Sequence, residues 1–245
     1  SSGYRINKAG DDAAGLAIAN GLNADYMALT QAVRNANDGI GIVQIADASL
    51  GQMGDMLARA TQLATQAASG TLGGQEREMV NTEYQQIMLE IDRVTQTANF
   101  KGERLFDENG AVTKSVYVGD TQVESNINIS IGGPGGVGTQ GLGLSNTDLS
   151  TQQGAVDALG QIQGAISRVS QFRGALGAQQ NRLINSVGII QVQSQNILAA
   201  ESTIMDANMA TEMSNFTRSR ILMESGMASV AQANATNQLV LQLFR

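Results

Sequence analysis

Few residues in this chain have the types and spacing that chemistry needs. It contains no His and no Cys, which removes the usual zinc ligands, the Cys nucleophile and the His general base. The stretch from Gly136 to Gly141 matches the G-x-G-x-x-G pattern of dinucleotide sites, and Asp157 follows near the expected spacing. However, the stretch lies in a wider glycine-rich segment without the β-α-β unit that such a site requires. We interpret it as a linker and predict no cofactor.

The remaining polar patterns favour structural roles. Asp11-Asp12 is typical of a helix start, because no neighbouring group would separate the pKa values of an acid/base pair. Glu90, Asp92 and Arg93 fit a charged face of a helix. Asn128-Ile-Ser130 matches the N-glycosylation pattern, which often occurs by chance. We therefore predict no catalytic residue and no metal site, and expect that the protein is not an enzyme.

Composition points to extended helices rather than a round domain. Aromatic residues make up 4% of the chain, Trp is absent and there is one Pro, so any core must be built from small and aliphatic side chains. The formal charge is -7, without a basic tract, which argues against a nucleic-acid partner. No apolar run is long enough for a membrane span, so we expect no membrane partner either.

The long stretch 11–69 organises the rest of the chain. Its apolar residues alternate in steps of four and three, as in a coiled coil, from Leu22 to Val43. The step from Val43 to Ala46 is a second three, a stammer, after which the alternation resumes to Ala67. Such a helix would be about 85 Å long, so it needs other helices beside it.

The following segments supply those neighbours. A second helix is predicted over 75–98, with apolar positions that include Met79 and Tyr84, and short β-branched alternations predict a β-hairpin over 112–131. The glycine-rich link 132–143 is expected to be a flexible surface turn. A third helix is predicted over 150–206, with Ser150 and Gln153 at capping-box spacing. The fold class is mainly α: an elongated rod of long antiparallel coiled-coil-like helices with a small β-hairpin.

The last segment, 207–245, has an apolar seam and nothing left in the chain to pair with. An unpaired apolar stripe implies assembly. The residues of this assembly seam are Met209, Met213, Phe216, Met223, Met227, Val230, Leu241 and Phe244.

Several strings from one end of the chain to the other resemble bacterial flagellin, the subunit of the flagellar filament. They cover nearly all of the chain apart from roughly residues 107–147 and stand in the family's order. On the N-terminal side they include Ser1-Ser-Gly-Tyr-Arg-Ile-Asn, Asp11-Asp-Ala-Ala-Gly-Leu-Ala-Ile-Ala and Phe100-Lys-Gly-Glu-Arg-Leu-Phe. On the C-terminal side they include Leu176-Gly-Ala-Gln-Gln-Asn-Arg-Leu and Leu241-Gln-Leu-Phe-Arg245.

The resemblance implies an architecture and a function. Residues 1–206 would form the rod domain and residues 207–245 the C-terminal helix of the filament's inner core, whose partner would be a helix preceding Ser1. No outer domain is expected, because only the glycine-rich link stands where flagellins often carry one. The implied protein is secreted, extracellular and a self-associating helical homopolymer of the bacterial flagellum. It would leave the cell by type III export, with a flagellar export chaperone at the C-terminal segment. The alternative is a hook-filament junction (hook-associated) protein.

The resemblance also implies recognition by a host. Flagellins sensed by Toll-like receptor 5 present residues that correspond to Arg59, Leu63 and Glu83. A spacing of four puts Arg59 and Leu63 on one helix face, and antiparallel packing would bring Glu83 beside them. This chain departs from the family pattern at Ala58 and Thr61-Gln62, so we expect a lower receptor affinity.

Overall fold

The structure is a computed structural model that describes residues 3–107, 110–119 and 125–243, with side chains of the last helix described through residue 234. The chain divides into two compact units. The larger consists of Asp25–Gln195, and the smaller combines Ser1–Ala24 with Asn196–Arg245.

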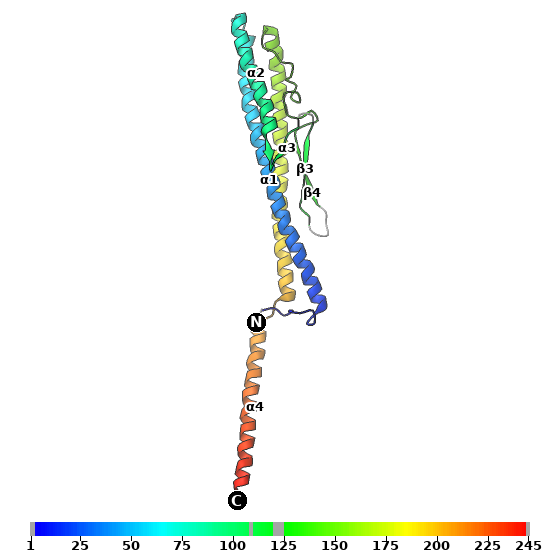
Figure 1. Ribbon diagram of the computed structural model, residues 1–245, viewed down its shortest axis with the longest axis vertical. Coiled ribbons are helices and arrows are strands. Elements are labelled where there is room, and N and C mark those ends of the chain that lie inside the picture. Colours follow the sequence, from blue (N-terminus) through cyan, green and yellow to red (C-terminus); the bar gives the residue numbers. More distant parts are fainter. Residues whose placement is uncertain (1–2, 108–109, 120–124, 244–245) are drawn as a thin grey trace. The chain divides into compact units, whose positions relative to one another are not determined.

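The larger unit is built on the whole of helix α2 (Gly74–Thr97) and on most of helices α1 (Ala13–Ala68) and α3 (Gln152–Met205) (Figure 1). The first turns of α1 and the last turns of α3 belong to the smaller unit. In the contacts between α1 and α3, residue numbers rise along α3 as they fall along α1. Gln152 donates a hydrogen bond to the carbonyl of Ala68, and Arg173 pairs with Asp47. The two helices therefore run antiparallel, as the sequence predicts.

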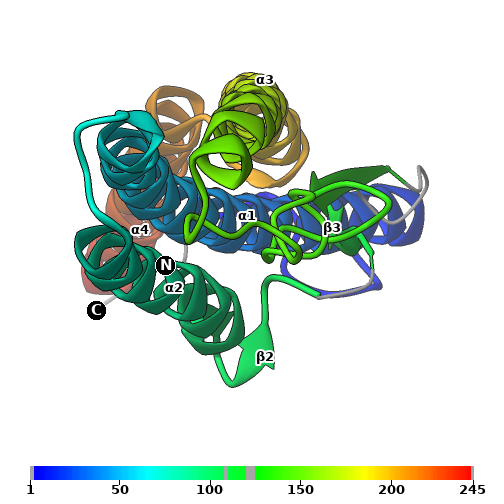
Figure 2. The ribbon, with the colours of Figure 1, turned by 90° about the horizontal axis from the view of Figure 1, so that it is seen from above.

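Helix α1 forms the centre of this unit, with α2 and α3 on different sides of it (Figure 2). Val43 and Ala46, the two sides of the predicted stammer, are both fully buried, and the seam beyond them stays buried to Ala67. Leu63 lies outside that seam but is also buried, at 2% exposure. Because α1 has more than one neighbour, it buries a wider stripe than the single seam of a two-stranded coiled coil.

Helix α2 follows α1 through a tight connection held by side chains. The carboxylate of Glu76 accepts a hydrogen bond from the backbone N–H of Gly73 at the start of α2. The guanidinium of Arg77 donates to the carbonyls of Ala67 and Leu72, which belong to the end of α1 and the connection after it. Arg77 therefore satisfies carbonyl groups that the end of a helix leaves without partners.

One predicted core position of α2 is wrong. Met79 is 70% exposed, and Val80 is buried in its place. Val80 lies four residues before the fully buried Tyr84, so these two residues share one helix face. The sequence alone did not distinguish the two neighbouring apolar residues.

Two antiparallel hairpins lie between α2 and α3. Strands β1 (Asn99–Phe100) and β2 (Glu103–Arg104) flank a turn in which Lys101 and Gly102 have positive φ angles of 51° and 87°. Strands β3 (Val112–Tyr117) and β4 (Asn126–Ile131) form the predicted larger hairpin, with Val112 opposite Ile131 and Tyr117 opposite Asn126. Alternate residues of β4 are buried, and Gly39 of α1 leaves room for Val116 and Ile129 to approach.

The segment between β4 and α3, residues 132–151, is named the glycine loop, and it is not the flexible surface turn expected from its composition. Four of its apolar side chains are at most 2% exposed: Val137, Leu142, Leu144 and Leu149. Asp92 of α2 accepts hydrogen bonds from the loop, and Arg168 of α3 donates one to the carbonyl of Gly141. The loop is thus packed and hydrogen-bonded to both helices.

The start of α3 also differs from the prediction. The hydroxyl of Thr151, not that of Ser150, caps the helix by accepting a hydrogen bond from the backbone of Gly154 at 3.0 Å. The Ser150 hydroxyl instead donates to Asp148. Since the third helical residue is Gly154, it has no side chain with which to complete the predicted capping box.

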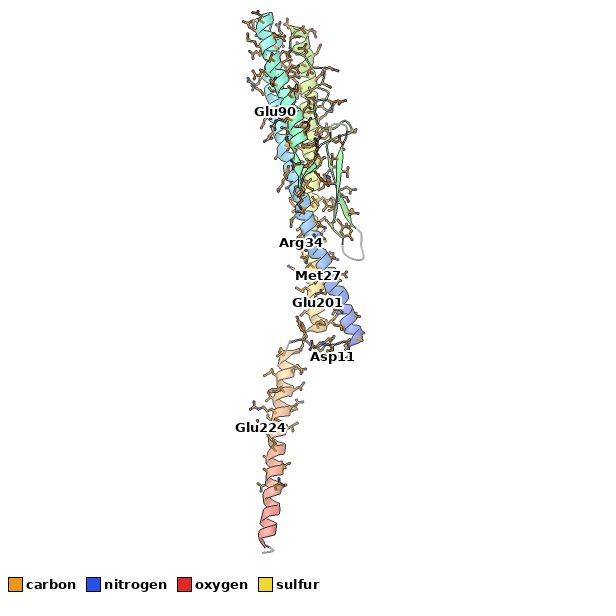
Figure 3. The ribbon with its side chains drawn as sticks, in the orientation of Figure 1. Asp11, Met27, Arg34, Glu90, Glu201 and Glu224 are labelled. Atoms are coloured by element: carbon orange, nitrogen blue, oxygen red, sulfur yellow. The ribbon has the colours of Figure 1, made fainter. Side chains whose placement is uncertain are left out.

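The smaller unit contains the lead-in to α1, the end of α3 and helix α4 (Met209–Leu243). Asp12 caps α1 as predicted, because its carboxylate accepts a hydrogen bond from the N–H of Gly15 at 2.9 Å. Asp11, labelled in Figure 3, accepts from the backbone N–H groups of Asn7 and Lys8. This pair therefore shapes the entry into α1.

Candidate functional site

Helix α4 carries the apolar side chains that the sequence predicts to be an assembly seam. The seam residues whose side chains are described are 49–62% exposed: Met209, Met213, Phe216, Met223, Met227 and Val230. Side chains project from every side of α4 around the labelled Glu224 (Figure 3). The side chain of Leu241 and the whole of Phe244 lie outside the described residues, so their place in the seam stays a prediction.

The sequence prediction missed two apolar residues of α4. Ile221 and Leu222 are 59% and 65% exposed, and at 3.6 residues per turn they lie away from the predicted seam. They line a shallow groove of about 590 Å³ together with Met213 and Thr217. The sequence contains the signal that would have identified these two residues, because α4 has apolar residues on all of its sides. That pattern is typical of a helix that is buried on more than one side.

Local interactions contribute to the helical state of α4, whose described side chains, through residue 234, are exposed. The Asn208 side chain accepts hydrogen bonds from the backbone N–H groups of Ala210 and Thr211, which caps the helix. Arg220 and Glu224 form an i,i+4 ion pair at 3.0 Å. These contributions are each small, so the helix has little stability of its own.

A second candidate surface lies on α1 and α2 in the larger unit. The guanidinium of Arg59 pairs with the carboxylate of Glu83 at 2.6 Å, and their side chains are 54% and 49% exposed. Arg59 also donates to Gln62. The antiparallel arrangement of α1 and α2 therefore brings these two predicted receptor residues together.

Leu63 does not share that exposed surface. Arg59 lies outside the buried stripe of α1, whereas Leu63 lies within it, next to Ala60, Ala64 and Ala67, all fully buried. The two residues lie one turn apart on α1, as their spacing predicts, but a spacing of four leaves a rotation of about 40° between them. That rotation is enough to cross the edge of the stripe.

Among residues 3–107, 110–119 and 125–243, no group of three or more acidic side chains is placed to hold a metal ion. Within the same ranges, none of the helices combines the length and the hydropathy needed to span a bilayer.

Comparison with known proteins identifies the family. Residues 1–111 match the bacterial flagellin N-terminal helical region, and residues 159–244 match the bacterial flagellin C-terminal helical region. The chain is 39% identical over 246 residues to the flagellin of Halalkalibacterium halodurans, covering 100% of this chain and 89% of that protein. It is 36% identical over 256 residues to the flagellar filament 33 kDa core protein of Treponema phagedenis, covering 100% and 90%.

Solved structures agree with these sequence relationships. The crystal structure of Bacillus cereus flagellin superposes with a TM-score of 0.56 at 26% identity, covering 69% of this chain and 94% of that one. A putative flagellar hook-associated protein from Vibrio parahaemolyticus has a TM-score of 0.62 over 80% of this chain and 100% of its own, but its 15% identity establishes a shared fold alone. With its N- and C-terminal regions both matched, the chain belongs to the bacterial flagellin family and is a structural subunit of the extracellular flagellar filament that serves motility.

Proposed function

We propose that the exposed apolar surface of α4 is the surface through which this subunit joins the filament. The observation that carries the proposal is the exposure of the six seam side chains, 49–62% each. Complete burial of one large apolar side chain contributes roughly 1.5–3 kcal/mol, so burial of the seam in an assembly is strongly favourable. The role is structural rather than catalytic.

In this proposal the other assembly faces lie on α1 and α3, particularly at residues 22–67 and 159–197. Repeated head-to-tail contact between identical subunits gives an open helical polymer when the rotation between them does not close a ring. In this proposal residues 1–206 form the rod domain and residues 207–245 the inner-core segment. Most of the stability of a helix in a protein comes from packing of its apolar face, and the described side chains of α4 are exposed. In this proposal α4 is therefore only partly folded in the free subunit and becomes fully helical on assembly.

The same surface suits a transient partner before assembly. A flagellar export chaperone would cover the apolar side chains of α4 until the subunit passes through the type III apparatus and is secreted. The chaperone and the filament would then compete for one surface. The proposal therefore predicts that a substitution in the seam weakens chaperone binding and filament assembly together.

Substitution in α4 tests the assembly surface. We expect Met213→Ser combined with Phe216→Ser to abolish addition of the subunit to filament seeds, measured by sedimentation. Ser225→Ala, a small change on the same helix, is the matched control and leaves addition unchanged. Normal incorporation of the double variant would overturn the proposal.

A second function is supported by the exposed ion pair of Arg59 and Glu83. We propose that Arg59 and Glu83 contact Toll-like receptor 5 when subunits are released from the filament. Exposed arginine side chains are frequent hot spots of protein interfaces, and Glu83 orients this one. Leu63, which is buried, would act by packing beneath the contact rather than by touching the receptor.

Direct titration of the receptor ectodomain tests this second function. Arg59→Ala is expected to weaken binding by more than about 1 kcal/mol. Arg34→Ala removes another exposed arginine of α1 that hydrogen-bonds a neighbouring glutamine, and it leaves binding unchanged. Equal affinities for the Arg59→Ala variant and the unmodified chain would remove Arg59 from the receptor site.

A further inference from the structure

The lead-in to α1 is bonded to the end of α3. We name residues 3–12 the N-terminal strap. The strap lies against the last residues of α3, directly before the start of α4, and all these parts belong to the smaller unit. Tyr4 and Asp206 form an antiparallel β-bridge. The strap therefore connects directly to the residues between α3 and α4.

Arg5 makes hydrogen bonds at this junction through both its side chain and its backbone. Its guanidinium donates to the carbonyl of Ile204 at 2.8 Å through Nη2 and 3.3 Å through Nε. Its backbone N–H donates to the carbonyl of Met205 at 2.6 Å. The end of a helix leaves its last four carbonyl groups without partners, and Arg5 satisfies two of those at the end of α3.

The strap also holds the residue directly before the cap of α4. The backbone N–H of Ala207 donates to the carbonyl of Gly3 at 2.9 Å. Asn208 follows, and its side chain accepts hydrogen bonds from Ala210 and Thr211 in the first turn of α4. The cap of α4 is therefore attached to a backbone position that the strap fixes.

The other end of the strap is anchored on α1. Ile6 is 2% exposed, and its Cδ1 lies 2.8 Å from the position that a Cβ on Gly15 would occupy. Asp11 closes the strap onto itself through the N–H groups of Asn7 and Lys8. Because it is held at this end, the strap can hold the junction at its other end.

We propose that the N-terminal strap, locked by Arg5, makes the junction 205–208 a nucleation site for α4. Forming the first turn of a helix is the costly step, because several residues are fixed for a single hydrogen bond, whereas each later residue adds its own. A junction that is already fixed, with Asn208 in capping position, removes part of that cost. Helix α4 then grows from Met209 toward the C-terminus when a filament surface covers it. The inference rests on the proposed folding of α4 during assembly and names the element that starts it.

Residue-resolved hydrogen exchange on the free, full-length chain tests the strap directly. Arg5→Ala should accelerate exchange about fivefold at the amides of Ala207, Ala210, Thr211 and Glu212, which corresponds to the loss of one ordinary hydrogen bond. Arg5→Lys keeps one donor and should restore part of the protection. The matched control Lys8→Ala removes another exposed cation of the strap but keeps the backbone bond to Asp11, and it should leave exchange unchanged.

Two results of the exchange experiment would overturn the proposal. One is unchanged protection at residues 210–212 in Arg5→Ala, and the other is an equal loss in Lys8→Ala. Exchange at Leu57, which is fully buried in the larger unit, should stay unchanged in every variant, so that loss of the whole fold is recognised separately.

Seeded elongation of filaments tests the consequence for assembly. Arg5→Ala should elongate more slowly than the unmodified chain, and Arg5→Lys should recover part of the rate. If Arg5→Ala exchanged faster at residues 207 and 210–212 but elongated filaments at the same rate as the unmodified chain, nucleation by the strap would be refuted as a step in assembly. If the unmodified chain failed to elongate filament seeds, the proposed assembly role of α4 would be contradicted. The exchange experiment would still decide whether the strap orders the start of α4.

Discussion

Asp92 on α2 holds Thr139 of the glycine loop through both of its carboxylate oxygens. One oxygen accepts the backbone N–H of Thr139 at 2.8 Å, and the other accepts its hydroxyl at 2.8 Å. Nearer the start of α2, the Gln85 side chain donates a hydrogen bond to the carbonyl of Thr147, and the Asn81 side chain accepts one from the backbone N–H of Leu149. A series of polar side chains on α2 therefore fixes a segment that is rich in glycine.

The Asp92 contact predicts a specific loss of stability. Asp92→Ala leaves two donors of Thr139 without their partner, and we expect the free energy of unfolding to fall by about 1–3 kcal/mol, measured by urea denaturation. Glu90→Ala removes a neighbouring carboxylate that pairs with the exposed Arg93, and it should change stability little. Equal stability of the two variants would contradict the anchoring role of Asp92.

Two glycines should respond to alanine with opposite signs. A Cβ on Gly141 would lie 2.2 Å from the carbonyl oxygen of Gly135, whereas a Cβ on Gly160 of α3 would meet no atom within 4 Å. Gly141→Ala should therefore lower the free energy of unfolding by about 1–3 kcal/mol. Gly160→Ala should raise it by up to about 1 kcal/mol, because alanine favours the helix. Stabilisation by Gly141→Ala in thermal or urea unfolding would mean that the loop does not pack as described.

Tyr84 predicts a decrease in stability at alkaline pH. Its hydroxyl lies 2.5 Å from the Thr147 hydroxyl in a buried site, and burial raises the pKa of Tyr84 above its ordinary value of 10.0, although the Thr147 hydrogen bond partly opposes this. The folded state therefore retains the phenol proton more tightly than the unfolded state. The contribution is fully present below pH 10.0 and is lost as the pH rises toward the folded-state pKa.

The matched variant is Tyr84→Phe. It should cost about 1 kcal/mol at neutral pH, from the lost hydrogen bond to Thr147, and should show a smaller decrease in stability above pH 10.0. Urea unfolding at a series of pH values measures both effects. A variant whose alkaline decrease matches that of the unmodified chain would show that Tyr84 is not its source.

The sequence predicts the long helices well because the period of their apolar residues repeats over many turns. A deviation at one position then changes the helical signal little. The stammer between Val43 and Ala46 and the β3–β4 hairpin are both visible in the pattern. The family resemblance in turn indicated the approach of Glu83 to Arg59, and the structure has this pair at 2.6 Å.

Two of the misses, at Leu63 and in the glycine loop, share a physical cause, which is contact between segments distant in the sequence. Leu63 is buried because α1 has a neighbour on more than one side, which the seam of a single helix pair does not reveal. The glycine loop looks like a linker by composition, yet Val137 and Leu142 are buried and Asp92, 47 residues away, holds it. Residues that bond across such distances leave no periodic signal.

The most direct test of the central claim is sedimentation of the chain with filament seeds, comparing the unmodified chain with the Met223→Ser, Met227→Ser double variant. The account predicts that the unmodified chain joins the sedimenting filaments and that the variant stays in the supernatant, because both methionines lie on the exposed seam of α4. Equal sedimentation of the two chains would mean that filament contacts reside elsewhere, and would contradict the assignment of α4 as the assembly surface.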